Sequence, residues 1–290
     1  MISILITSFK EPDTIGKAIE AFTKQDIDEA YELIVVAPDD ETLSVAEKHG
    51  VKTFRDPGRG KSYAINLVLP ELKGDVIILS DGDVFIGGGS LKHIMKYFRH
   101  KNTGCVTARV VSADSGKTMF GYWSHLMCWA AHNLRAKRMR KGKFLECSGY
   151  LWAFRNKVIK RFPLDVGEDT IVPIMFYLKK WEIKYAEKAL VFVNYPKNMK
   201  DFLKQKKRTA GAHDNIKKYV AKKRIPRMKT FWNEVAGGIG LFTYPRSFKE
   251  FIWTIWIFPF RLYIWLSLFF NSKLLGRKYS DGWRRVDSTK

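Results

Sequence analysis

Cysteine is scarce in this 290-residue chain, in which Cys105, Cys128 and Cys147 are the three thiols. An odd number without metal-ligand spacing indicates neither a disulfide framework nor a zinc site, so a reduced cytosolic setting is expected. The N-terminus also lacks the charged leader of a signal peptide. Its first apolar run, ISILITSF, is short enough for a strand, and secretion is not expected.

Acidic residues are the second deficit. Asp and Glu total 29 against 51 Lys and Arg, which gives a net charge of +22. A surface this basic attracts an anionic partner, such as nucleic acid, acidic lipid or a phosphorylated substrate. Charge alone leaves these three classes open. The chain also lacks internal repeats and low-complexity linkers, so a repeat architecture is not expected.

Hydrophobic residues make up 46% of the chain, enough for a substantial core. Strands are predicted to alternate with helices over the first hundred residues, and a similar pattern resumes over residues 146–195. This alternation predicts an α/β fold with a mainly parallel sheet and helices on both of its faces. The predicted strands are residues 2–8, 32–36, 51–55 and 75–80, and the predicted helices are residues 14–23, 42–50 and 60–72.

An Asp-Gly-Asp sequence, Asp81 to Asp83, follows the fourth predicted strand. Ligands of parallel α/β sheets bind at the carboxyl ends of the strands, and Gly82 leaves room for a close approach. Two carboxylates on one side of an extended segment suit a hard cation such as Mg²⁺ or Mn²⁺, which often bridges to phosphates. The alternative is an ordinary turn, because Asp and Gly are common turn residues.

Six short segments follow one another in the order SILITSFKEPDTI, GRGKSYAIN, DGD, SGYLWAFR, GED and QKKRTAGA. In this order and spacing they resemble the motifs of inverting family 2 glycosyltransferases with the GT-A fold, over residues 1–212. The resemblance implies a nucleotide-binding catalytic domain with a mainly parallel sheet. Residues 213–290 then form a basic and hydrophobic C-terminal region with amphipathic or apolar helices that associates with a membrane.

The resemblance also assigns the donor side of the site. Asp83 matches the metal ligand, and Asp81 lies near the ribose and diphosphate and serves as a second ligand. Asp39 is assigned to the nucleobase, with Asp40 as its competitor. The other residues matched to nucleotide-sugar contacts are Ser8, Phe9, Glu11, Arg59 and Lys61, with Phe9 standing where the family usually has Tyr. For Arg59 and Lys61 a solvated basic turn is the alternative.

The GED segment resembles the family's ED motif, which makes Asp169 the general base that takes the proton from an acceptor hydroxyl. The alternative is a helix N-terminus in which these acidic residues only cap the helix and favour its dipole. By the same resemblance, Glu168, Gly149 and Tyr150 lie near the acceptor.

The QKKRTAGA segment resembles a Q-x-x-R-W signature of membrane-bound polysaccharide synthases. Gln205 and Arg208 match and are assigned to the nucleotide-sugar, with Arg208 on its diphosphate and Lys207 as a further candidate there, but Thr209 replaces the tryptophan. In the family that tryptophan lies beside the acceptor, so its replacement argues against processive polymer synthesis. A solvated basic helix is the alternative.

Two segments raise the question of a membrane. Residues 120–143 are aromatic in their first half and basic in their second, which suits either an interfacial helix or a core helix. Residues 251–270 are long enough to cross a bilayer, but Pro259 and Arg261 in the middle oppose a simple span. We expect this segment to lie in the cytosolic face of the membrane, as in a peripheral or monotopic protein. A single crossing and a buried helix of a soluble protein are the alternatives.

The expected function is therefore metal-dependent, inverting transfer of a sugar from a UDP- or GDP-sugar to a hydroxyl of a lipid-linked or membrane-proximal glycan. A processive polysaccharide synthase and a polyprenyl-phosphate glycosyltransferase are alternatives within the family. A nucleic-acid-binding protein is the non-enzyme alternative. It is disfavoured because acidic residues occupy the predicted strand ends, whereas nucleic-acid platforms interleave aromatic and basic residues on strands.

Overall fold

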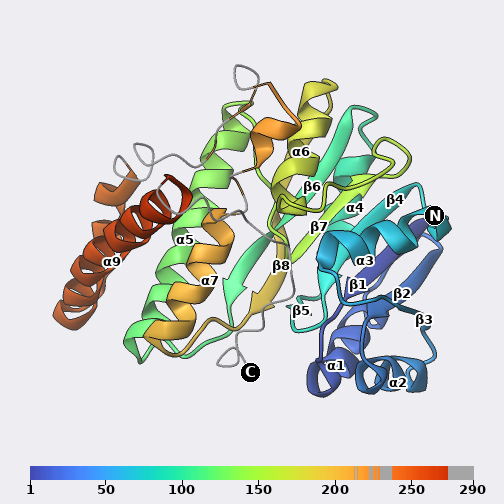
Figure 1. The fold of residues 1–290 in the computed structure, drawn as a ribbon, viewed down its shortest axis with the longest axis horizontal. Helices are drawn as coiled ribbons and strands as arrows, with labels where there is room; N and C mark the ends of the chain where they lie inside the picture. Colours follow the sequence, from blue (N-terminus) through green and yellow to red (C-terminus); the bar gives the residue numbers. More distant parts are fainter. Residues whose placement is uncertain (212, 214, 222–224, 227, 229–236, 274–290) are drawn as a thin grey trace.

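A computed structural model describes residues 1–211, 213, 215–221, 225–226, 228 and 237–273. Within these residues the chain forms an eight-stranded sheet with helices on both faces (Figure 1). The strand order is β3-β2-β1-β4-β7-β6-β8-β5. The predicted α/β class is therefore confirmed.

The strands and helices have the following bounds. The strands are β1 (Ile2–Thr7), β2 (Tyr31–Ala37), β3 (Lys52–Arg55), β4 (Val76–Asp81), β5 (Phe85–Ile86), β6 (Thr103–Ser112), β7 (Leu151–Arg155) and β8 (Glu182–Val193). The α-helices are α1 (Pro12–Thr23), α2 (Asp40–Lys48), α3 (Lys61–Val68), α4 (Ser90–Phe98), α5 (Met119–Arg140), α6 (Glu168–Leu178), α7 (Met199–Gly211) and α9 (Phe248–Lys273).

The central strands are buried on both faces, which explains their continuous apolar sequences. Successive side chains point to opposite sides of the sheet, so Val36 and Leu79 join one core with α3 and α6. Val35 and Ile78 join a second core with α1, α2 and α4. Helices therefore cover both faces of the sheet, as the sequence predicted.

The second half of the sheet departs from the parallel expectation. The pairs among β1 to β4 are parallel, but β7 runs antiparallel to both β4 and β6, and β5 runs antiparallel to β8. A helix between two strands permits a parallel crossover but does not require one, and β6 and β7, which are sheet neighbours joined through α5, pair antiparallel. Because Ser80 pairs with Leu151, the residues just before β7 lie beside the carboxyl end of β4.

Helices α5, α7 and α9 pack together at the end of the sheet away from β3 (Figure 1). Trp123 of α5, Phe202 of α7, and Ile257 and Phe260 of α9 share one buried cluster. Of the two alternatives for residues 120–143, the structure shows a helix packed inside the molecule, with the Trp123 side chain 1% exposed. The C-terminal region thus contributes α9 to a core shared with the first 212 residues.

Helix α9 contains the whole apolar segment, residues 251–270, and continues through Pro259. No helix among the described residues is both long enough and apolar enough to cross a membrane. The buried-helix alternative holds for one face only, because Ile257 and Ile264 are buried while Trp256 and Leu262 are exposed. Residues 274–290, which carry much of the basic C-terminus, lie outside the described residues.

Candidate active site

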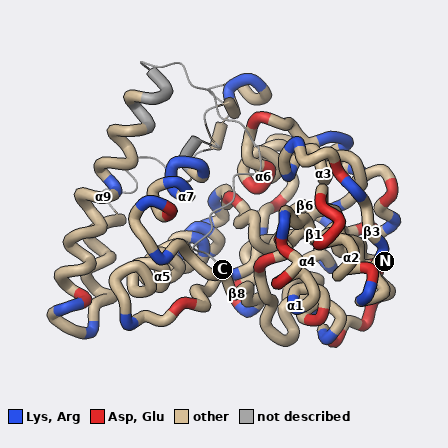
Figure 2. Tube along the Cα trace, turned by 60° about the horizontal axis from the view of Figure 1, so that its bottom comes forward, with Lys and Arg blue, Asp and Glu red and all other residues tan. Residues whose placement is uncertain are grey.

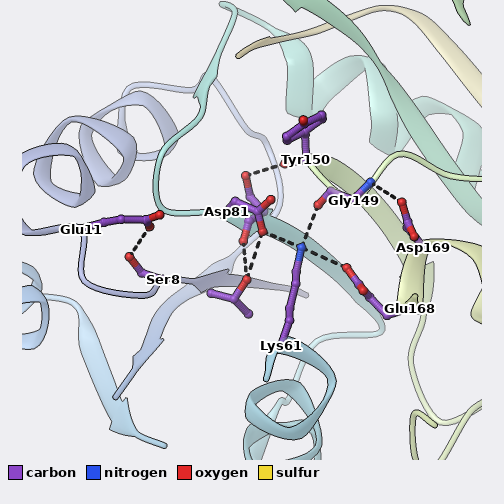
Figure 3. A network of polar contacts seen from close by, with 10 residues as sticks. Ser8, Glu11, Lys61, Asp81, Gly149, Tyr150, Glu168 and Asp169 are labelled. Carbon is purple, nitrogen blue, oxygen red and sulfur yellow. Dashed lines mark hydrogen bonds and ion pairs between the residues drawn. The ribbon is translucent and has the colours of Figure 1, made fainter. Parts of the chain in front are cut away.

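The carboxyl ends of β1 and β4 lie side by side, because these strands pair in parallel with Thr7 opposite Asp81. The first turns of α3 and α6 and the residues before β7 meet at the same edge of the sheet (Figure 3). This edge therefore brings together most of the residues that the motifs single out: Ser8, Glu11, Lys61, Asp81, Gly149, Tyr150, Glu168 and Asp169.

Lys61, the first residue of α3, links the two acidic motifs. Its Nζ lies 2.5 Å from Asp81 Oδ1 and 3.0 Å from Glu168 Oε1, and it donates a hydrogen bond to the Gly149 carbonyl at 3.0 Å. The side chain is 12% exposed. Burial alone would lower the pKa of Lys61, but the two carboxylates outweigh it and raise that pKa. Lys61 is therefore not part of a solvated basic turn, which was the alternative interpretation.

Ser8 and Glu11 form a tight contact over Gly82. The Ser8 hydroxyl donates to Glu11 Oε2 at 2.7 Å, and a Cβ on Gly82 would lie 2.4 Å from Ser8 Oγ. The loop between them passes through Lys10, whose φ of 57° is in the left-handed region that non-glycine residues seldom occupy. Glycine at position 82 is thus required by packing, and the loop after β1 is held in an uncommon conformation.

The carboxylates on the donor side are crowded. Burial, followed by the charges of Asp83 and Asp81, raises the pKa of Glu11 to about 8. Burial and the charge of Asp81 likewise raise the pKa of Asp83 to about 6, although Lys61 and Arg208 oppose the shift. Burial and the negative charges of neighbouring carboxylates thus disfavour the ionised forms of Glu11 and Asp83.

This crowding fits a divalent cation, whose charge would favour the ionised form of the same carboxylates. Among the described residues, no group of three or more His, Cys, Asp or Glu side chains is arranged to hold a metal ion by itself. The donor set of Asp81 and Asp83 instead suits an ion that completes its coordination with water and substrate phosphates. The predicted ligands are therefore compatible with Mg²⁺ or Mn²⁺.

Asp169 lies across Gly149 from Lys61. Its Oδ2 accepts a hydrogen bond from the Gly149 N–H at 3.0 Å, and its carbonyl accepts one from Cys147 N–H at 3.2 Å. The N-cap of α6 is Gly167, and no side chain caps this helix by a hydrogen bond. The carboxylate is therefore directed toward the strand-end loop rather than used as a helix cap.

Asp39 has a structural task at the end of β2. Its Oδ1 caps α2 by accepting from the Thr42 N–H at 3.0 Å, and its Oδ2 accepts from the Lys10 N–H at 2.8 Å. Burial opposes ionisation, but these hydrogen bonds prevail and lower the pKa of Asp39. Its competitor Asp40 is ion-paired with Arg55. The assignment of Asp39 to the nucleobase remains a prediction.

The remaining predicted residues surround this group. Arg208 of α7 is within electrostatic range of Asp83 and Tyr150, and burial raises the pKa of the Tyr150 hydroxyl. The Tyr150 carbonyl accepts a hydrogen bond from Ser80 Oγ at 2.9 Å. Gln205 is buried in α7.

Two further predicted residues lie in loops. Arg59 lies over the Tyr63 ring, 5.5 Å from its centroid. Phe9 lies in the loop after β1, where the Lys10 ammonium is 5.8 Å from the centroid of its ring.

Two threonines that the motifs did not single out position the site. Thr7 Oγ1 donates to Asp81 Oδ1 at 3.3 Å, and Thr42 Oγ1 accepts from the Glu11 N–H at 2.9 Å. Thr7 is the last residue of a strand, which is a weak signal. Thr42 stands three residues after Asp39, the spacing of an N-cap, and this signal was available in the sequence.

The family described as glycosyltransferase-like family 2 matches residues 1–212, the part of the chain that carries every motif described above. The chain belongs to glycosyltransferase family 2. Its catalytic domain is therefore that of a glycosyltransferase, and the resemblance of the motifs is confirmed at the level of the family. No curated protein matches the chain.

Solved structures share the GT-A fold of this family 2 glycosyltransferase. A mannosyltransferase, PcManGT from Pyrobaculum calidifontis in complex with GDP-Man and Mn²⁺, has a TM-score of 0.62 at 16% identity, over 94% of this chain and 84% of that one. Glucosyl-3-phosphoglycerate synthase from Mycobacterium tuberculosis, with Mn²⁺, UDP and phosphoglyceric acid, has a TM-score of 0.55 at 18% identity, over 74% and 78%. S. aureus TarS with UDP-GlcNAc has a TM-score of 0.51 at 15% identity, over 83% and 79%.

Proposed function

We propose that this protein transfers a sugar from a UDP- or GDP-sugar to a hydroxyl of a lipid-linked or membrane-proximal glycan, with inversion at the anomeric carbon. The observation that carries the proposal is the division of the site. Asp81 and Asp83 form one acidic group at the end of β4, and Asp169 forms another at the start of α6. Lys61 and Gly149 connect the two groups.

The donor side holds the nucleotide-sugar. We propose that Asp83, with Asp81, would hold Mg²⁺ or Mn²⁺, which supplies charge stabilisation for the departing nucleoside diphosphate. Two of the similar structures described above contain Mn²⁺ with GDP-Man or UDP, which supports this choice. Arg208, already within electrostatic range of Asp83, adds positive charge on the same side. Ser8 and Glu11 line the loop assigned to the nucleoside.

On the acceptor side, Asp169 takes the proton of the attacking hydroxyl. One bond forms between the acceptor oxygen and the anomeric carbon, while the bond from that carbon to the phosphate oxygen breaks. Because the attack comes from the face opposite the leaving group, a single displacement inverts the anomeric configuration. The Gly149 N–H orients the Asp169 carboxylate through its hydrogen bond. General-base assistance of this kind contributes about 10²- to 10⁴-fold to rate.

A hydroxyl acceptor is favoured over a phosphate because an ionised phosphate has less need of a general base. Transfer of single sugars is favoured over processive synthesis because Thr209 stands where the synthases have tryptophan. A membrane-proximal acceptor accords with the net charge of +22 and with the apolar C-terminal segment.

The deciding experiment incubates the purified full-length protein with Mn²⁺ and a panel of UDP- and GDP-sugars, with and without detergent-solubilised polyprenyl-linked glycans. The proposal expects one donor to release its nucleoside diphosphate with the acceptor present, and the product to carry a glycosidic bond of inverted configuration. Retained configuration, or transfer only to a polyprenyl phosphate, would contradict it.

A further inference from the structure

Helix α9 carries a continuous apolar strip on the side that faces away from the rest of the molecule. We call this strip the outer face of α9. Its members recur at three- and four-residue spacing, as one side of a helix requires. They are the exposed residues Ile252, Ile255, Trp256, Pro259, Leu262, Tyr263, Leu266 and Phe270.

The opposite side of α9 is packed against protein. Ile257, Phe260 and Ile264 are buried in the cluster that includes Trp123 and Phe202. The Trp123 indole N–H donates to the Trp253 carbonyl at 2.7 Å, and Tyr122 and Thr254 share a buried hydrogen bond of 2.6 Å. These contacts fix the rotation of α9, so its outer face is held toward the surroundings.

The apolar area of this face is unusual for a surface. Trp256 is 59% exposed and Leu262 is 49% exposed, and their neighbours on the strip are also large and apolar. Phe242, which is 40% exposed, lies beside α9, because its ring stacks on Phe258 with centroids 5.3 Å apart. Contiguous exposed apolar patches of this kind mark interaction sites.

The dimensions suit a helix lying in the plane of a membrane. The strip from Ile252 to Phe270 is about 27 Å long at the helical rise per residue, slightly short of the roughly 30 Å of a hydrocarbon core. A spanning orientation would also draw the charged side chains of α5 and α7 into the hydrocarbon, because both helices pack on α9. When α9 lies in the plane of the membrane, only its outer face enters the hydrocarbon.

Cations border the strip where head groups would lie. Arg246 and Lys249 are exposed at its N-terminal end, and the Lys249 ammonium lies 4.6 Å from the Trp253 ring centroid. On the side of α7, the Lys207 ammonium lies 5.1 Å from the Tyr263 ring centroid. Figure 2 shows mainly basic residues on α7, basic residues together with the acidic Glu250 in the first turn at the lower end of α9, and little charge along the middle of α9. This pattern complements an anionic lipid surface.

We propose that the outer face of α9 docks in the plane of an anionic bilayer, with Trp256 and Tyr263 at the interface. Helix α7 links the outer face of α9 to the donor side of the site, because Lys207 lies over the Tyr263 ring and the next residue, Arg208, is within electrostatic range of Asp83. Docking would thus place the mouth of the site at the membrane surface, where a lipid-linked acceptor presents its glycan. This last point rests on the proposed function, whereas the docking surface does not.

The test measures co-flotation of the full-length protein with vesicles of phosphatidylcholine, with and without phosphatidylglycerol. Binding to the anionic vesicles should weaken from low to high salt without vanishing, because salt screens the cations but not apolar burial. Leu262→Glu should lower the affinity about tenfold or more. Leu67→Glu changes a leucine of similar exposure on α3 and should bind as the wild type does.

A second measurement guards against misfolding. Lipids with brominated acyl chains should quench tryptophan fluorescence on binding, and Trp256→Phe should remove a large share of that quenching while vesicle affinity changes little. Both variants should unfold thermally at the wild-type temperature, since the substituted side chains are exposed.

Three outcomes would overturn the proposal: absence of binding to anionic vesicles, equal binding by Leu262→Glu, or resistance of the bound protein to alkaline carbonate, which indicates a span. A stable dimer that ignores vesicles would assign the outer face to a second copy of the chain. Nucleoside diphosphate release with a detergent-solubilised acceptor tests the proposed function without a bilayer. If no nucleoside diphosphate is released although the protein binds vesicles, the proposed function is refuted and the docking surface is still supported.

Discussion

The ammonium of Lys61 lies 3.0 Å from Glu168 Oε1, although the two residues come from the first turns of different helices. The same ammonium lies 2.5 Å from Asp81 Oδ1 at the end of β4. One buried cation thus ties the donor-side carboxylates to the segment that presents Asp169. The separation between the donor and acceptor groups depends on this bridge.

Lys61→Met should therefore damage both stability and turnover. Removing one partner of a buried ion pair leaves uncompensated charge and costs about 3 kcal/mol or more in the free energy of unfolding. Turnover should fall on the order of 10²-fold because the two acidic groups lose their alignment. Lys61→Arg, which keeps the charge, is the matched control and should retain most of the stability. Chemical denaturation and steady-state kinetics measure the two effects, and wild-type turnover in Lys61→Met would refute the positioning role.

Gly82→Ala should weaken nucleotide binding. The added Cβ would lie 2.4 Å from Ser8 Oγ and 2.8 Å from Glu11 Oε2, so the loop after β1 must move. Gly88→Ala is the control, since nothing lies within 4 Å of a Cβ there. Calorimetric titration with UDP or GDP in the presence of Mn²⁺ should show a loss of about tenfold or more for Gly82→Ala alone. Equal affinities for the two variants would mean that the loop does not hold the nucleotide.

Asp83→Asn should abolish transfer, because an amide is a poorer ligand for a hard cation than a carboxylate. Treatment of the wild type with EDTA should have the same effect. Added Mn²⁺ should restore the EDTA-treated wild type but not the variant. The assay is nucleoside diphosphate release, and full activity of Asp83→Asn would remove this residue from the metal site.

Asp169→Asn should lower turnover by on the order of 10² or more, since the amide cannot accept the acceptor's proton. Nucleotide affinity should change little, because the substitution keeps size and much of the hydrogen bonding to Gly149. Kinetics and nucleotide titration separate the two quantities. If donor affinity and turnover fell together, Asp169 would belong to nucleotide binding or to the structure of the site.

Asp165→Asn should reduce stability in a pH-dependent way. The Asp165 carboxylate pairs with Lys218 and accepts a hydrogen bond from Tyr219 Oη at 2.5 Å, which ties the loop before α6 to the segment after α7. Burial opposes ionisation, but these two partners prevail and lower the pKa of Asp165 below its ordinary value of 3.8.

Because the folded-state pKa is depressed, the stabilisation is present above pH 3.8 and is lost as the pH falls through the folded-state pKa. Because the pair lies at the surface and is screened by solvent, the variant should unfold about 1 kcal/mol or less more easily than the wild type at neutral pH, and the difference should shrink in acid. Asp26→Asn, at a carboxylate that is 88% exposed, is the control and should differ little from the wild type. A difference that stays constant down to low pH would exclude the ion pair as its source.

Local signals in the sequence predicted the first four strands and the acidic group after β4. Buried runs such as VIILS leave little alternative to a central strand, and parallel strands bring their carboxyl ends to one edge of the sheet. The position of Asp81 and Asp83 at a ligand-binding edge was therefore determined by the order of apolar runs and polar residues. The resemblance to the family motifs then assigned Asp81 and Asp83 their predicted role as metal ligands.

Tertiary structure alone decided how the charged residues are paired. A solvated basic turn was the alternative to nucleotide contact for Lys61, yet the side chain is largely buried against Asp81 and Gly149, and Gly149 is 88 positions away in the chain. Asp39 caps α2, although the helix was expected to begin only at Thr42. A sequence shows which side chains carry charge, but the energy of a charge depends on the partners and solvent that the fold places around it.

The same division applies to α9. Composition alone determined that residues 251–270 form an apolar segment, and Pro259 with Arg261 argued against a simple span. Only the packing of Trp123 and Phe202 against Ile257 and Phe260 decided which side of the helix is covered and which side is exposed. In a segment that is apolar nearly all round, the periodicity of the sequence carries little information about its buried side, so contacts with other elements must select it.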